Sequence, residues 1–159
     1  MPKPARLPAG RQLARAAKSV SRAFDDALAE AGGSLPVWLV LLSLKSRPLR
    51  NQRELADAVG IKQATLTHHL NAMDARGLIS RTRDAANRRV QVVTVTEAGE
   101  AAFVRLREAA MAFDARLRTG LSEGELAGLS ELLGRLAANV GAGDQAPPWA
   151  RAAERGPRT

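Results

Sequence analysis

The hydrophobic pattern of this chain changes its period at Gly77, and this change limits the possible folds more than any other feature. Before Gly77, two short segments, 52–59 and 63–76, have apolar residues at helical spacing, and Gly60 lies between them. Two short helices that meet at a glycine are typical of a helix-turn-helix.

The residues after Gly77 have the character of strands. Segments 78–83 and 90–95 are rich in β-branched side chains, and the polar residues 84–89 between them predict a turn. The sequence therefore predicts a β-hairpin directly behind the helix-turn-helix, which is the arrangement of a wing.

Longer helical patterns flank this central part. Helix start signals stand at Ser34, at Asn51 with Glu54, at Thr96, and at Ser122 with Glu125. The flanking helices are predicted over residues 11–31, 35–46, 97–119 and 123–140. On the long helix after the hairpin, the candidate buried residues are Ala98, Ala101, Ala102, Leu106, Ala109, Phe113 and Leu117. The predicted fold is mainly α with a small β-hairpin wing.

The composition excludes several classes of function. The chain has no cysteine, which excludes disulfides, thiolate metal sites, iron–sulfur clusters and cysteine redox switches. Neither a phosphate-binding glycine loop nor a nucleophile elbow occurs, so we expect no enzymatic activity and no cofactor. No apolar run approaches the roughly 20 residues that span a bilayer, and the basic N-terminus lacks the apolar stretch of a secretory signal. We therefore expect a cytoplasmic protein without a membrane partner.

The net charge of +8 is concentrated in two segments. Residues 1–22 contain six basic residues and no acidic one, and residues 45–89 contain ten basic and four acidic residues. This distribution is expected if the two segments meet a polyanion such as DNA. A solvated basic face explains the charge alone equally well.

Four stretches resemble the MarR family of bacterial transcriptional regulators, over roughly residues 10–140. The stretch LPVWLVL at 35–41 is similar to the family's buried second helix, and the motifs between Glu54 and Thr67 are similar to its helix-turn-helix. The stretch DARGLI at 74–79 resembles the junction into the wing, and the stretch from Asn87 to Gly99 resembles the wing tip and its exit into the next helix.

This resemblance implies a homodimer that binds double-stranded DNA. The winged helix-turn-helix of residues 34–96 is then the DNA-binding domain, and the helices of residues 10–33 and 97–140 interlock with those of a second chain. From its composition, the segment 1–9 is predicted to be a flexible basic arm and the segment 141–159 a disordered tail.

One residue departs from the family pattern. The family usually has an aspartate two residues before the wing arginine, where this chain has Asn87. A carboxylate orients an arginine through an ion pair, whereas an amide offers a weaker, neutral hydrogen bond. We therefore expect the wing arginine to be less firmly positioned here.

The second helix of the helix-turn-helix has a polar face for DNA. Leu66, Leu70 and Met73 serve the core, so the candidate DNA-contacting residues are Gln63, Ala64, Thr65, Thr67, His68 and Asn71. Glutamine and asparagine can bond adenine in the major groove, and the threonine methyl group suits thymine. Because neighbouring side chains on a helix point about 100° apart, His68 and His69 are not expected to share a metal ion.

Cationic and polar side chains supply the remaining candidate contacts. The wing candidates are Arg81, Arg83, Arg88 and Arg89, and the family pattern favours Arg89 for the narrow A·T-rich minor groove. The candidate phosphate contacts are Asn51, Gln52, Arg53 and Lys62. Solvated surface is the alternative interpretation for each of them.

These predictions together indicate a sequence-specific, DNA-binding transcriptional regulator, expected to be a repressor on a near-palindromic operator. The family implies a small aromatic or anionic effector, whose pocket Phe24, Trp38 and Met73 could line, although they also fit a plain core. Two alternatives remain open: a sequence-indifferent architectural DNA-binding protein, and a winged-helix module for protein–protein contact.

Overall fold

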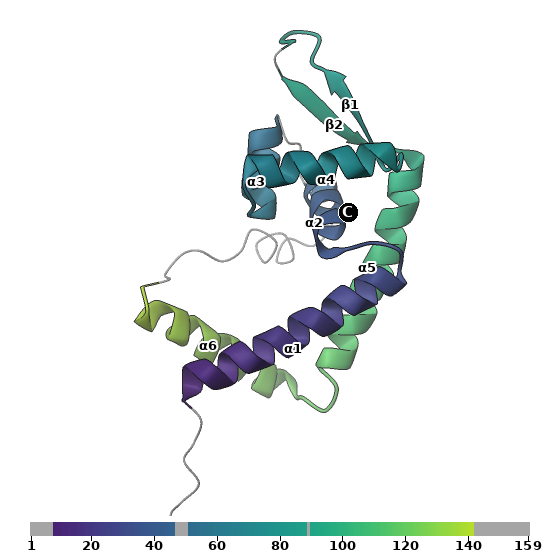
Figure 1. Cartoon of the computed structure of the whole chain (residues 1–159). Coiled ribbons are helices and arrows are strands. Elements are labelled where there is room, and N and C mark those ends of the chain that lie inside the picture. Colours follow the sequence, from purple (N-terminus) through teal and green to yellow (C-terminus); the bar gives the residue numbers. More distant parts are fainter. Residues whose placement is uncertain (1–7, 47–50, 89, 142–159) are drawn as a thin grey trace, which may run out of the picture.

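A computed structural model describes residues 8–46, 51–88 and 90–141, and Figure 1 shows the arrangement of the elements. Their order is α1 (Ala9–Glu30), α2 (Leu35–Ser46), α3 (Gln52–Val59), α4 (Gln63–Ala75), β1 (Ile79–Arg83), β2 (Gln91–Val95), α5 (Glu97–Leu117) and α6 (Glu123–Asn139). The predicted mainly α fold with a two-stranded wing is confirmed. Helix α1 begins at Ala9, so the last residue of the predicted arm is helical. Residues 1–7 and 142–159 of the predicted arm and tail lie outside the described residues.

Helix α2 is the centre of a lobe that it forms with α3, α4, β1 and β2. Its sequence is apolar on every side, and it packs against α1, α3, α4, α5 and β2. Val40 and Leu41 are fully buried, and they share one core cluster with Leu66 and Leu70 of α4 and with Leu106 of α5. The lobe and the long helix α5 therefore have a continuous core, which fixes the orientation of α4.

The wing is an antiparallel hairpin in a single register. Ile79 pairs with Val95 at the root of the hairpin, and Arg83 pairs with Gln91 at the end next to the turn. The Ser80 and Thr94 hydroxyls lie 2.7 Å apart across the two strands. In Figure 1 the hairpin extends beyond α4, away from α1 and α6.

The root of the wing is joined tightly to the start of α5. Thr96 caps this helix by accepting from the Gly99 N–H at 3.1 Å, and its hydroxyl donates to the Gly77 carbonyl at 2.5 Å. A Cβ atom on Gly99 would lie 1.9 Å from the Leu78 carbonyl oxygen. Only glycine permits this approach, so residue 99 fixes the contact between α5 and the wing.

The helices outside the lobe have little cover within the chain. Helix α6 has no buried residue, and on α5 the predicted buried residues Ala98, Ala101 and Leu117 are exposed within the single chain. The prediction assumed one apolar stripe along α5. Ala102 and Leu106 of this stripe are buried in the core cluster, and α5 packs against α1, α2 and β2.

The capping box predicted at the start of α6 is present. The Ser122 hydroxyl accepts from the Glu125 N–H at 3.2 Å, and the Ser122 N–H donates to the Glu125 carboxylate at 2.8 Å. The hydrogen bonds from the Ser122 backbone and side chain lower the pKa of Glu125. The ionised carboxylate therefore stabilises the start of this helix.

No single helix of the described residues is long and apolar enough to cross a membrane. Helices α1 and α2 pass that test of length and composition only as a pair, bent by 77° at the break between them.

Candidate nucleic-acid interface

The local sequence sets the angle between α3 and α4. Asn51 caps α3 by accepting from the Glu54 N–H at 2.9 Å. Gly60 ends the helix in the left-handed conformation, with φ of 79°, and donates to the Ala56 carbonyl at 2.8 Å. A side chain at this φ is strained, so the glycine allows the sharp turn between the two helices.

Helix α4 presents the polar face that the sequence predicted. Leu66, Leu70 and Met73 are buried, and all the predicted contact residues are exposed: Gln63, Ala64, Thr65, Thr67, His68 and Asn71. The Thr67 hydroxyl donates to the Gln63 carbonyl at 2.9 Å. This hydroxyl is therefore engaged within the helix.

The four predicted phosphate contacts fall into two groups. Arg53 and Lys62 are exposed. Asn51 and Gln52 are half-buried and have partners inside the protein: Asn51 caps α3, and the Gln52 amide donates to the Gln91 side chain of β2 at 2.7 Å. Gln52 thus joins the helix-turn-helix to the wing, whereas Asn51 stabilises the start of α3.

The wing arginines also differ in their surroundings. Arg83 and Arg88 are exposed, whereas the Arg81 side chain is only 20% exposed and pairs with Asp74 at the end of α4, at 3.1 Å. The structure thus places Arg81 in an internal ion pair. The predicted minor-groove residue, Arg89, lies outside the described residues.

Asp84 is a structural residue of the wing that the sequence analysis did not identify. Its carboxylate accepts from the backbone N–H groups of Ala86 and Asn87, at 2.7 and 2.8 Å. An aspartate at the start of a polar turn is a known signal for this Asx-type geometry, so the sequence did contain a pointer to it.

The predicted ligand residues pack against α5 and the core. Phe24 contacts Phe113 with ring centroids 5.0 Å apart, and Trp38 stacks on Phe103 at 5.6 Å. Met73 is 1% exposed and belongs to the core cluster. Phe24 and Trp38 are half-buried.

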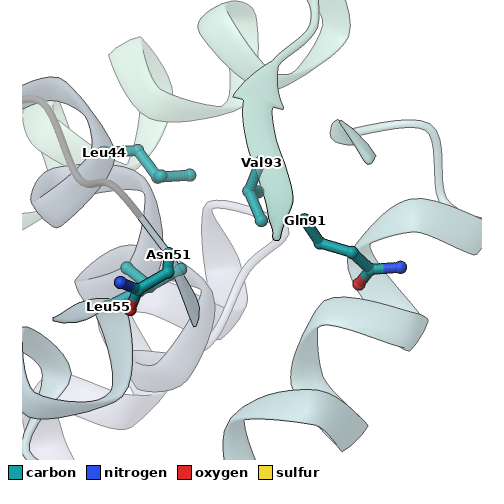
Figure 2. Close-up of a pocket in the computed structure, with 5 residues that line it drawn as sticks. All are labelled: Leu44, Asn51, Leu55, Gln91 and Val93. Carbon is teal, nitrogen blue, oxygen red and sulfur yellow. The ribbon is translucent and has the colours of Figure 1, made fainter. Parts of the chain in front are cut away.

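Two hollows in the described part of the structure lie away from these residues. Figure 2 shows a cavity between α2, α3 and β2, lined by Leu44, Asn51, Leu55, Gln91 and Val93. Its volume is about 10 Å³, which is room for about one water molecule. A wider, open hollow of about 440 Å³ lies on α1 beside Arg11, Ala14, Arg15 and Lys18. Neither hollow is lined by the predicted ligand residues.

Within the described part of the chain, no three histidine, aspartate or glutamate side chains are grouped so that they could hold a metal ion. The rings of His68 and His69 lie 5.8 Å apart, at an interplanar angle of 63°.

Comparison with known proteins gives both a family and solved relatives. A sequence model of the MarR family matches residues 34–90. The transcriptional repressor CouR, solved with a 23-mer DNA duplex, is 30% identical; the match covers 82% of this chain and 92% of CouR, with a TM-score of 0.72. CouR from Rhodococcus jostii RHA1 has also been solved with p-coumaroyl-CoA bound.

Two further regulators share the fold. BpsR of Bordetella bronchiseptica, whose DNA binding is regulated by 6-hydroxynicotinic acid, is 23% identical, with 86% of this chain and 98% of that chain covered and a TM-score of 0.71. PcaV of Streptomyces coelicolor is 22% identical, with 86% and 99% covered and a TM-score of 0.76.

Proposed function

This chain belongs to the MarR family of transcriptional regulators, and we propose that it represses transcription by binding a near-palindromic operator as a homodimer. The observation that carries this proposal is the exposed polar face of α4, which lies on the same lobe as a wing with two exposed arginines. The repressor CouR, which is 30% identical and was solved with a DNA duplex, supports this proposal.

The two parts of the lobe contact different features of DNA. Gln63, Thr67 and Asn71 of α4 enter the major groove, where their side chains distinguish base pairs. Arg83 and Arg88 of the wing, which are exposed, reach the adjacent minor groove together with Arg89. Lys62 and the first N–H groups of α4, which no side chain caps, bind a phosphate between the two.

The exposed apolar surface supports the homodimer. All the large hydrophobic side chains that are exposed in the described chain lie on α1, α5, α6 or the residues next to them, and none lies on the DNA-binding lobe: Leu13, Val20, Val104, Met111, Leu117, Leu121, Leu129, Leu132, Leu133, Leu136 and Val140. Apolar surface of this extent marks an association site. A second copy covers it, and the two-fold symmetry of the dimer matches a near-palindrome.

An effector regulates the dimer by favouring a spacing of the two lobes that does not fit the operator. CouR and BpsR, with p-coumaroyl-CoA and 6-hydroxynicotinic acid, suggest an aromatic, anionic ligand. Phe24 and Trp38, which pack at the junction of α1 and α2 with α5, line its site. Met73 does not, because the core covers it.

The decisive experiment is selection of genomic fragments by the purified protein, followed by competition. We expect a near-palindromic site that random duplex displaces poorly, with an affinity that falls steeply with salt. Equal displacement by random duplex would favour an architectural DNA-binding protein. Absence of salt-dependent binding would favour a protein-interaction module.

The dimer is tested by charging the α6 face. Leu132→Asp is expected to give a monomer in sedimentation experiments, because one carboxylate would be buried without a partner in the interface. Glu131→Gln, on an exposed neighbouring residue, is the control and is expected to remain a dimer. A dimeric Leu132→Asp protein would remove α6 from the interface.

A further inference from the structure

The turn at the tip of the wing is built around Asp84. Its Oδ1 atom accepts from the Ala86 N–H at 2.7 Å and from the Asn87 N–H at 2.8 Å. The backbone closes the same turn, because the Asp84 N–H donates to the Val90 carbonyl at 2.9 Å and the Val90 N–H donates to the Asn87 carbonyl at 2.8 Å. One carboxylate oxygen therefore connects the end of the strand pairing to the tip.

We propose that Asp84 is the positioning residue of the wing in DNA binding, and that it acts by holding the tip backbone rather than by pairing with an arginine. This inference rests on the proposed function. Arg88 is exposed and directly follows the residue whose N–H is held. A tip that is ordered before it meets DNA does not lose conformational entropy on binding.

The charge of Asp84 argues against a direct role at DNA. A carboxylate near the phosphates opposes binding, and none of the ion pairs among the described residues involves Asp84. An acceptor oxygen for two backbone N–H groups accounts for an aspartate at this position. Asparagine provides the same acceptor oxygen without the charge. Asp84→Asn therefore keeps the contacts to the tip backbone but would remove an ion pair with an arginine.

The test compares Asp84→Ala with Asp84→Asn on the selected operator. We expect Asp84→Ala to bind about tenfold more weakly, since two hydrogen bonds that order the tip are lost. Asp84→Asn is expected to bind at least as tightly as the wild type. If Asp84→Asn binds as weakly as Asp84→Ala, the residue acts through its charge, and the proposal is wrong.

A matched control accounts for the change of charge. Asp57 is an exposed carboxylate on α3 of the same lobe, and Asp57→Ala and Asp57→Asn remove the same charge without touching the wing. We expect these two variants to bind alike. The difference between the two Asp84 variants then measures the backbone contacts alone.

Amide hydrogen exchange gives a readout that does not need DNA. The Ala86 and Asn87 N–H groups are expected to be protected in the wild type and in Asp84→Asn, and to exchange faster in Asp84→Ala. Equal exchange in all three proteins would show that the cap does not order the tip. If the Ala86 and Asn87 N–H groups were protected but the variants bound the operator equally well, Asp84 would have a structural role only.

A wild-type protein with no specific DNA binding would instead overturn the proposed function. The exchange data would still decide whether Asp84 caps the turn.

Discussion

Asp74 and Arg81 join helix α4 to the wing through a single carboxylate oxygen. Asp74 Oδ2 accepts from Arg81 Nη2 at 3.1 Å and from Arg81 Nε at 3.2 Å. Asp74 lies in the last turn of α4, and Arg81 lies in the middle of β1. The pair therefore sets the orientation of the hairpin relative to the helix.

We expect Asp74→Ala and Arg81→Ala each to weaken operator binding, and the double variant to be no weaker than either single one. The coupling free energy from thermal unfolding is expected to be about 0.5–1 kcal/mol, because the two side chains are partly screened by solvent. Arg107→Ala, on the exposed side of α5, is the control. If only Arg81→Ala lost affinity, and the salt dependence fell by about one ion, Arg81 would be a phosphate contact.

If Thr67 contacts DNA as proposed, we expect it to do so through its methyl group. Its hydroxyl is engaged with the Gln63 carbonyl, so Thr67→Val is expected to bind the operator within about twofold of the wild type. Thr67→Ser removes the methyl group and is expected to bind about fourfold more weakly, the equivalent of one buried methyl. Gel-shift titrations measure both variants. A valine variant weaker than the serine variant would assign the hydroxyl to a base.

Gly99→Ala is expected to lower the free energy of unfolding by more than about 2 kcal/mol, because the new Cβ atom would overlap the Leu78 carbonyl oxygen. Urea unfolding at fixed protein concentration measures this loss. Gly10→Ala is the control: it lies in α1 with no atom within 4 Å of its added Cβ, and it is expected to be neutral or slightly stabilising. Similar stability of the two variants would contradict the close approach at residue 99.

The lowered pKa of Glu125 predicts that the stability of α6 depends on pH. Its pKa is lowered from 4.5 by the hydrogen bonds from Ser122, so its stabilising effect is present above that value and is lost as the pH falls through the lower, folded-state pKa. We expect Glu125→Gln to reduce the thermal stability near neutral pH and to flatten its decline below pH 4.5. Circular dichroism measures both, with Glu131→Gln as the control. An unchanged pH profile would place Glu125 outside the cap in solution.

Much of the fold could be predicted from short stretches of the sequence. The caps at Asn51, Thr96 and Ser122 stand where the sequence put the helix starts, and Gly60 adopts the left-handed conformation that ends α3. These features depend on a few neighbouring residues. The polar face of α4 was predictable for the same reason, because helical periodicity separates Leu66, Leu70 and Met73 from it.

The errors at Ala98, Ala101 and Arg81 concern contacts between different helices and strands, whereas the omission of Asp84 concerns a local turn. Periodicity marked Ala98 and Ala101 as apolar, but it carries no information about whether another helix covers them. Arg81 looked like one of several wing cations, and only the path of β1 beside α4 brings it to Asp74. The role of Asp84 depended on the conformation of the turn, whereas the pattern of residues had directed attention to Asn87.

The close approach of Gly99 to Leu78 ties the first turn of α5 to the root of the wing. This helix has 21 residues and is about 31 Å long at 1.5 Å per residue. A rotation of α5 by about 5° around this contact would move the far end of the helix by roughly 3 Å. Conversely, a displacement of several ångströms among the terminal helices would rotate the wing by only a few degrees. The length of α5 would thus convert a displacement of the terminal helices into a small change in the orientation of the wing.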